Sequence, residues 1–133
     1  MGKAKVLGIL MSLVGLLDSL YLLVVEVQGR PPSFCDMSKV VNCGRVEFSP
    51  FSHLFGVPDP VLGIGFFLTS LVLWYLDRVS YIPYLWVLGV TFVGYFVFTE
   101  WLVGSICVYC TLAHVMCVAQ IIPIMGRGLV KRP

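Results

Sequence analysis

IPYLWVLGVTFVGYFVFTEWLV, residues 82–103, is followed after the single residue Gly104 by SICVYCTLAHVMCVAQIIPIM, residues 105–125. Either run, coiled as an α-helix, is long enough to cross a hydrocarbon core about 30 Å thick, which takes about 20 residues at roughly 1.5 Å each. Because the connection is so short, the second helix has to run back alongside the first. The stretch therefore predicts a pair of antiparallel membrane-spanning helices.

Two more apolar runs precede this pair, at residues 6–25 and 61–76, and the second is short for a full crossing. The chain of 133 residues has only 12% charged residues and a mean hydropathy of +0.95, which excludes an ordinary soluble globule. The first run exceeds the apolar part of a secretion signal and no A-x-A-like cleavage site follows, so we expect a retained span. The sequence predicts one domain, residues 1–133, built as an all-α integral membrane bundle of four transmembrane helices.

The basic residues indicate how such a bundle is oriented. Six of the nine would share one side of a four-span protein: Lys3, Lys5, Arg78, Arg127, Lys131 and Arg132. The excess of positive charge predicts that this side is cytoplasmic. Both termini are then cytoplasmic, and the loop at residues 26–60 is extracytoplasmic. The net charge of +2 follows from this topology and points to no nucleic-acid partner.

One segment of the long loop, residues 50–55, has the signals of a short helix. Ser49 precedes Pro50 as an N-cap before a favoured first-turn proline, and Gly56 is suited to end the helix. Its apolar side chains, Phe55 among them, fall near helical spacing, so the aromatic rings are expected to point into the membrane. We expect this half-helix to cap the bundle and to roof a cavity between the spans.

Two cysteine pairs face the extracytoplasmic side in this arrangement. Cys107 and Cys110 form a C-x-x-C motif at the start of the fourth span, and Cys35 and Cys43 lie in the long loop. A C-x-x-C dithiol can close a disulfide and reopen it, taking two electrons from one partner and passing them on. Disulfides persist outside the cytoplasm. The four cysteines therefore predict an electron relay.

The fourth span is expected to begin with Ser105 as its N-cap, after a break at Gly104. Cys107 then lies in the first turn, where the helix dipole favours a thiolate. Cys110 lies three residues deeper and is expected to be less hydrated, so the two sulfurs should not be equivalent. Cys117, deep in the same span, is expected to be a packing residue.

Other roles compete for these cysteines. Cys35 and Cys43 can form a static disulfide that only pins the loop. The seven residues between them do not resemble a zinc knuckle, which argues against a zinc site made by all four thiols, and we expect no metal. Covalent haem needs C-x-x-C-H, but Thr111 follows Cys110. For Cys107 and Cys110 the remaining alternative is a pair of small buried packing residues.

Ionisable side chains within apolar runs are costly unless paired or hydrated, so they mark candidate functional positions. His114 lies four residues after Cys110 and seven after Cys107, on the same helix face. It could donate a hydrogen bond or a proton to a bound substrate, and a contact between helices is the alternative. Asp18 is expected to be a buried polar partner, and Glu100 is expected to reach the interface.

An ordered set of short motifs extends over nearly the whole chain: Cys35-Asp36, Cys43-Gly44-Arg45-Val46, Ser49-Pro50, Phe55-Gly56-Val57-Pro58, Leu62-Gly63 and Cys107-x-x-Cys110. This set resembles the vitamin K epoxide reductase family and its prokaryotic homologues, and it is far more specific than any one motif. The resemblance implies an enzyme of the prokaryotic cell membrane. Its fold would be a four-helix bundle around a quinone pocket, capped by a half-helix and by the cysteine-bearing loop.

In that family, electrons from a thioredoxin-like partner enter at the first loop cysteine, which matches Cys35. The second loop cysteine, matching Cys43, exchanges with the first cysteine of the membrane pair, matching Cys107. The last cysteine, matching Cys110, faces the quinone. Many bacterial homologues carry a fused thioredoxin-like domain, whereas this chain ends at Pro133, so the resemblance implies a thioredoxin-fold partner in trans.

The resemblance also implies the quinone contacts. The family serine before the half-helix falls on Ser49, and Phe55 belongs to the same segment. An asparagine and a tyrosine that hydrogen-bond the quinone carbonyls in vertebrate members fall on Asp59 and His114 here, a departure that counts against vertebrate-like epoxide chemistry. From the residues alone, Asp59 either caps the second span or faces the cavity.

The sequence thus predicts a membrane thiol-disulfide oxidoreductase that passes electrons from a thioredoxin-fold partner to a quinone and supports disulfide-bond formation. The quinone would be of the menaquinone, ubiquinone or phylloquinone type. A non-enzymatic membrane scaffold with a structural loop disulfide is one alternative. Another is the bacterial DsbB type of quinone-linked disulfide generator, but its C-x-x-C lies near the start of the second span, and here the motif opens the fourth.

Overall fold

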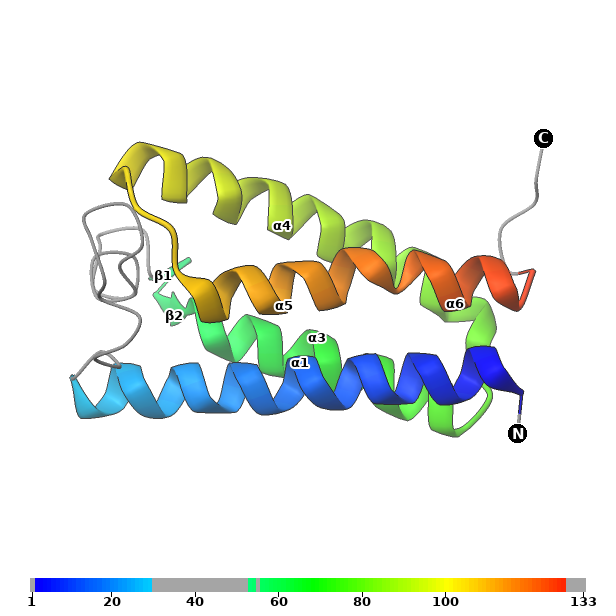
Figure 1. Ribbon diagram of the computed structural model, residues 1–133. Helices are drawn as coiled ribbons and strands as arrows, with labels where there is room; N and C mark the ends of the chain where they lie inside the picture. Colours follow the sequence, from blue (N-terminus) through cyan, green and yellow to red (C-terminus); the bar gives the residue numbers. More distant parts are fainter. Residues whose placement is uncertain (1, 30–52, 55, 129–133) are drawn as a thin grey trace.

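The computed structural model describes residues 2–29, 53–54 and 56–128 of the protein. Its elements, in chain order, are α1 (Lys3–Gln28), β1 (His53–Leu54), β2 (Val57–Pro58), α3 (Asp59–Tyr75), the 3₁₀ helix η1 (Val79–Tyr81), α4 (Ile82–Val103), α5 (Val108–Ala119) and α6 (Ile121–Gly126). The long helices run lengthwise beside one another (Figure 1). The start of α1 and α6 lie at one end of the bundle, and the two short strands lie at the other (Figure 1).

Three helical segments in the described residues are long and apolar enough to cross a membrane: Lys3–Gln28, Val79–Val103 and Val108–Gly126. The other long apolar helix, α3, has 17 residues, slightly fewer than the about 20 that a perpendicular crossing takes. The predicted bundle is therefore confirmed as a mostly helical arrangement with three to four helices able to span a membrane. This makes the chain an integral membrane protein.

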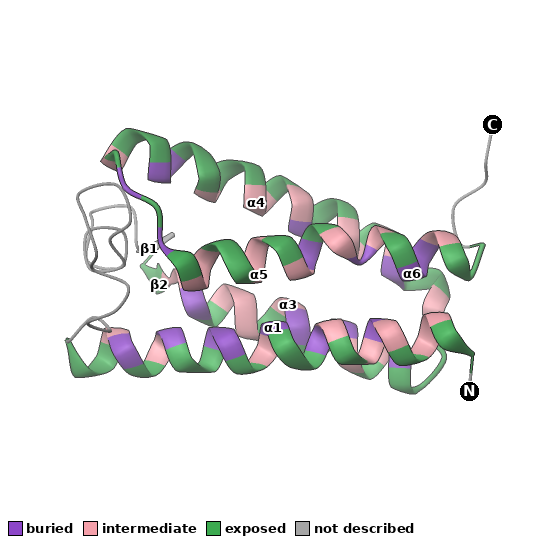
Figure 2. Ribbon diagram, in the orientation of Figure 1, coloured by how far each residue is buried: buried purple, intermediate pink, exposed green. Residues whose placement is uncertain are grey.

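Small residues bring α1 and α3 into the most extensive helix contact of the described chain. On the buried face of α1 (Figure 2), Gly8 lies against the Trp74 ring and Gly15 against the Phe67 ring. Both approaches are so close that a Cβ at either glycine would overlap the ring. Lipid tails are as apolar as the helix surfaces, so the hydrophobic effect does not drive two helices together. Close van der Waals packing at small residues supplies the attraction.

Replacing Gly15 by Ala is expected to destabilise the bundle by about 1 to 3 kcal/mol, the usual cost of overpacking. The added methyl group would have to displace the Phe67 ring. Denaturant-induced unfolding of the detergent-solubilised protein measures the change. Gly94→Ala in α4 is the matched control, because nothing lies within 4 Å of the added Cβ, and it should be neutral or slightly stabilising. Equal destabilisation by both variants would contradict the packing argument.

A group of buried polar side chains, the Gln120 cluster, joins α1, α3 and the α5–α6 junction. The Ser12 and Ser70 hydroxyls lie 2.8 Å apart. Gln120 accepts a hydrogen bond from Ser70 Oγ at 2.9 Å and donates one to Ser12 Oγ at 3.2 Å, and Trp74 Nε1 donates to Gln120 Oε1 at 3.4 Å. All four side chains are at most 1% exposed. Mutual hydrogen bonds remove the cost of burying their polar atoms.

The fourth predicted span is one apolar segment made of two helices, and Pro123 explains the break between them. Proline has no N–H to donate to the Ala119 carbonyl, and its ring crowds that carbonyl. Just before it, the Gln120 N–H donates to the Cys117 carbonyl at 3.3 Å, a tighter three-residue spacing. The break places the Gln120 side chain inside the bundle.

Charged residues gather where the α3–α4 turn meets the start of α1 and the end of α6. Asp77 accepts a hydrogen bond from Lys5 Nζ at 2.9 Å, which holds the pKa of the exposed Asp77 carboxyl below its usual range. Arg127 Nη1 lies 3.9 Å from the other Asp77 oxygen. For the residues described, the basic side chains from these three segments therefore share one end of the bundle, as the charge pattern predicts.

The helix predicted at residues 50–55 is wrong where the structure describes it. His53–Leu54 is β1, which pairs with β2 as an antiparallel hairpin. Gly56 has a positive φ of 80°, which suits the tight turn of a hairpin as well as the end of a helix. The rest of that segment lies outside the described residues, as do Ser49 and Phe55.

Candidate active site

A cavity of about 440 Å³ lies between α1, α3, α4 and α5. Hydrocarbon side chains and aromatic rings make up most of its wall, including the rings of Phe66, Phe67, Phe92 and Phe96. Small-molecule sites are typically concave and mostly apolar, with volumes of about 300–1,000 Å³ and a few well-placed polar groups. The cavity is therefore suited to a ligand with a flat apolar ring.

Side chains that can carry a proton come from all four helices around the cavity. They are Glu26 of α1, Asp59 of α3, Glu100 of α4, and Cys110, His114 and Cys117 of α5. Among the predicted site residues, the structure brings Asp59, Cys110 and His114 together around this one space. Cys35 and Cys43 lie outside the described residues.

The N-cap of α5 is Cys107 and not, as the sequence predicts, Ser105. Cys107 has extended backbone angles, φ −95° and ψ 123°, and its Sγ accepts the Cys110 N–H at 3.4 Å. The Ser105 N–H donates to the Glu100 carbonyl at 3.3 Å and so belongs to the turn that closes α4. A sulfur at the N-cap lies at the positive end of the helix dipole.

The prediction that Cys110 is the less hydrated sulfur is also wrong. Cys107 is 0% exposed and packs against Leu22 of α1. Cys110 is only partly buried and lines the cavity. Position along the helix does not decide burial here, because Cys107 faces a neighbouring helix and Cys110 faces an open space. The two sulfurs are inequivalent, as expected, but in the opposite sense.

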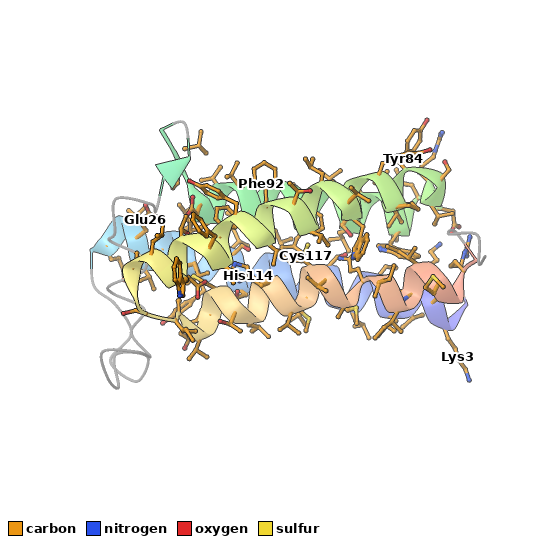
Figure 3. The ribbon with its side chains drawn as sticks, turned by 90° about the horizontal axis from the view of Figure 1, so that it is seen from above. Lys3, Glu26, Tyr84, Phe92, His114 and Cys117 are labelled. Carbon is orange, nitrogen blue, oxygen red and sulfur yellow. The ribbon has the colours of Figure 1, made fainter. Side chains whose placement is uncertain are left out.

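His114 lies in the cavity wall between an aromatic ring and a carboxylate. Its imidazole stacks on Phe96, with ring centroids 6.1 Å apart and planes inclined by 9°. His114 Nδ1 lies 3.8 Å from Glu100 Oε1, which is within reach of an ion pair but too long for a hydrogen bond. Figure 3 shows His114 nearer to the strand end of the bundle than Cys117.

Asp59 is the first residue of α3, and Pro58 precedes it in the N-cap position. Of the two roles that the sequence leaves open for Asp59, the structure therefore supports the one facing the cavity, which Asp59 lines. Its Oδ1 atom is buried and makes no hydrogen bond within the described residues. A ligand with a hydroxyl or N–H group would satisfy that oxygen.

Glu100 lies inside the bundle, which contradicts the prediction that it reaches the interface. Its side chain lines the cavity, and the residue is 8% exposed. The Glu100 carboxylate accepts the backbone N–H of Cys107. Asp18 is buried as predicted, at 7% exposure, but is not among the residues described as lining the cavity. The sequence signal for Glu100 was its place in the last turn before the C-x-x-C connection.

Cys117 is buried against α4, in agreement with its expected packing role. A Cβ added at Gly89 would lie 2.8 Å from Cys117 Sγ, so the sulfur occupies the space beside that glycine. Within the described residues, no three His, Cys, Asp or Glu side chains are grouped to hold a metal ion.

Apolar helices around an aromatic cavity, with a C-x-x-C motif at its edge, define an integral membrane protein with a candidate thiol site. The profile of the vitamin K epoxide reductase family matches residues 6–124, and the chain therefore belongs to that family, as the resemblance predicts. Comparison with curated proteins and with solved structures gave no match. Membership gives the chain oxidoreductase activity in a membrane bundle, and the family is in general linked to quinones.

Proposed function

We propose that the protein is a membrane thiol-disulfide oxidoreductase that passes electrons from a thioredoxin-fold partner, through Cys35 and Cys43 and then Cys107 and Cys110, to a quinone. The observation that carries this proposal is the position of Cys110. It lines an aromatic cavity between apolar helices and is in hydrogen-bond contact with Cys107. A dithiol at the edge of a cavity that fits a flat ring is the arrangement that such a reaction needs.

The cavity offers each part of a quinone a suitable surface. Phe92 and Phe96 provide ring faces for stacking of the quinone ring. His114 can donate a hydrogen bond to one quinone oxygen, and Asp59 can donate to the other in its protonated form or accept from the hydroxyl of the hydroquinone. The remaining apolar wall can receive the hydrocarbon tail.

The burial of Cys107 supports a relay through the loop. Cys107 is 0% exposed, so a folded partner cannot reach its sulfur directly. In the proposed order of steps, the partner dithiol first reduces the Cys35–Cys43 disulfide. The Cys43 thiolate then attacks Cys107 of the Cys107–Cys110 disulfide. Cys110 leaves as a thiolate, and Cys35 releases Cys107 by re-forming its bond with Cys43.

The last step returns the membrane pair to its disulfide. Cys107 and Cys110 lose two electrons and two protons as one S–S bond forms, and the quinone gains both electrons and both protons to become a hydroquinone. The oxidised and reduced species therefore balance without another reagent. The net result is the oxidation of a partner dithiol by a membrane quinone.

The quinone content of the purified protein tests this function. Organic extraction of the protein in mild detergent should yield a quinone, and dithiothreitol should reduce an added short-chain quinone only when Cys107 and Cys110 are present. Partner oxidation that survives replacement of both cysteines would support the scaffold alternative, in which the loop disulfide is only structural.

The orientation is part of the proposal, and it predicts that Cys35 and Cys43 are labelled from outside the cell. A membrane-impermeant maleimide applied to intact cells after reduction should reach these two cysteines. A cysteine introduced as Gly2→Cys, exposed beside the start of α1, is the matched control and should react only after the membrane is opened. Labelling in the reverse order would place the loop in the cytoplasm and exclude the proposed compartment.

A further inference from the structure

We propose that Glu100 and His114 act as one proton-carrying pair in the cavity wall. His114 gives a proton to the quinone, and Glu100 holds the imidazole and stabilises its positive charge. The inference rests on the proposed function, because it assigns the protonation step of quinone reduction. Glu100 acts through His114 and is a positioning residue, whereas His114 is the group that touches the substrate.

The orientation of the imidazole is the first support. His114 Nδ1 faces Glu100 Oε1 at 3.8 Å and the residue lines the cavity, so we assign contact with the ligand to the other ring nitrogen, Nε2. The stacking on Phe96, at an inclination of 9°, holds the ring plane. A carboxylate within ion-pair reach of one imidazole nitrogen stabilises the protonated ring.

The burial of Glu100 is the second support. Its Oε1 atom has no hydrogen-bond partner among the described residues, and the residue is 8% exposed. An acid at this depth is costly unless it is paired. Lysine and arginine are missing from the described lining of the cavity, and His114 is the basic side chain found there. An ion pair with a protonated His114 would therefore compensate the buried charge of Glu100.

Glu100 also contacts the turn that holds the C-x-x-C motif. Its carboxylate accepts the Cys107 N–H, and its carbonyl accepts the N–H groups of Gly104 at 2.8 Å and Ser105 at 3.3 Å. A change of charge on Glu100 therefore changes its interaction with the imidazole and with the backbone N–H of Cys107. One residue connects the thiol turn to the proton donor.

Four other titratable side chains in the described residues line the same cavity: Glu26 of α1, Asp59 of α3, and Cys110 and Cys117 of α5, the helix that also carries His114. All four can contribute to the pH dependence of the reaction. These contributions are common to the wild-type protein and a Glu100 variant, so they cancel in a direct comparison.

The proposed step leaves the pair unchanged after each turnover. As the S–S bond between Cys107 and Cys110 forms, two electrons pass to the quinone and the thiols give up two protons. The imidazolium of His114 donates one proton from Nε2 to a quinone oxygen, and a thiol proton restores it. The second thiol proton completes the hydroquinone.

Glu100→Gln tests the pair, because Gln keeps the side-chain length and an acceptor for the Cys107 N–H but cannot carry the charge. The assay is quinone reduction by the full chain in detergent, with dithiothreitol as donor and a short-chain ubiquinone as acceptor. We expect kcat to fall by about 10- to 100-fold, with little change in KM for the quinone, because Glu100 acts through His114 and its replacement loses less than the about 10²- to 10⁴-fold effect of a general acid itself. The alkaline limb of the pH profile should move to lower pH, because the imidazolium loses a stabilising charge.

His114→Ala should remove that limb, and adding Glu100→Gln to His114→Ala should have no further effect on it. Asp18→Asn is the matched control, a buried acid at 7% exposure that is not among the described lining residues, and it should leave the profile unchanged. If the wild-type protein is active and the pH profile of Glu100→Gln is unshifted, the proposed pair is wrong and the proposed function stands. A wild-type protein that does not reduce the quinone overturns the proposed function and the pair with it. If Glu100→Gln does not fold, an alkaline limb in His114→Asn identical to that of wild type overturns the pair.

Discussion

Replacing Cys107 by Ser is expected to stop turnover and to leave a coloured complex between the Cys110 thiolate and a bound quinone. Cys107 Sγ accepts the Cys110 N–H at 3.4 Å and is the sulfur with which Cys110 closes its disulfide in the proposed mechanism. Without it, the Cys110 thiolate can share charge with the quinone but cannot complete a two-electron transfer. Turnover should fall by at least about 10³-fold, as expected when a covalent partner is lost.

The absorption difference spectrum on adding a short-chain quinone to purified Cys107→Ser protein measures the complex. The band should vanish when Cys110→Ser is added. Cys117→Ser is the matched control, since Cys117 lies on the same helix without a partner at C-x-x-C spacing, and the variant should keep turnover without forming the band. A band that persists without Cys110, or normal turnover of Cys107→Ser, would show that the cavity is not where thiol and quinone react.

A disulfide between Cys43 and Cys107 should accumulate when Cys35 and Cys110 are both replaced by Ser. In the proposed relay this bond is a passing intermediate, and the double substitution removes both cysteines that would resolve it. Cys107 is 0% exposed, so reagents and other chains reach it poorly. A disulfide also requires the two Cα atoms to approach within roughly 4.4–6.8 Å. Nearly complete cross-linking after mild oxidation would therefore report a specific approach of the loop.

Disulfide mapping by mass spectrometry measures this cross-link, with Cys117 replaced by Ala throughout. The matched controls leave either Cys35 with Cys107 or Cys43 with Cys110, and both should cross-link far less. Equal cross-linking in all three proteins would mean that the loop approaches without preference. A wild-type Cys35–Cys43 bond that survives in every redox state would leave only the role of a structural staple.

The helices of this bundle were predictable because a chain in lipid must satisfy every backbone N–H and C=O within itself, and an apolar run then has to be a helix. The bounds of α4 agree with the apolar run at residues 82–103. Local signals were enough there, since Pro83 lies in the first turn and Gly104 ends the helix with a left-handed φ of 81°. No contact with another helix was needed to place either end.

The two errors in the fold come from residues that suit more than one local structure. Gly56 can end a helix or turn a hairpin with the same positive φ, and the pairing of β1 with β2 decides between them. Ser105 can cap a following helix or close a preceding one, and its hydrogen bond to the Glu100 carbonyl decides for the latter. Both choices depend on neighbours that a single stretch of sequence does not reveal.

The candidate site was predictable in its composition more than in its arrangement. Helical spacing placed Cys110 and His114 on one face, and both line the cavity. The same spacing placed Cys107 with them, although Cys107 turns to Leu22 of α1 instead. Spacing along one helix cannot show which neighbour lies opposite each side chain. For the same reason the burial of Glu100 beside His114 emerged only from the packed helices.

The Gln120 cluster has a consequence for protons. Ser12, Ser70 and Trp74 fill the space between α1, α3 and the α5–α6 junction with no exposure to solvent, and their hydrogen-bonding atoms are engaged with one another or with Gln120. By chain position Ser12, Ser70 and Gln120 lie between the cavity-lining residues of their helices and the end that carries Lys5, and we expect this dry layer to keep water from passing between the two. Protons exchanged during quinone reduction should then come from and return to one compartment only. The protein would then reduce membrane quinone without letting protons cross the membrane.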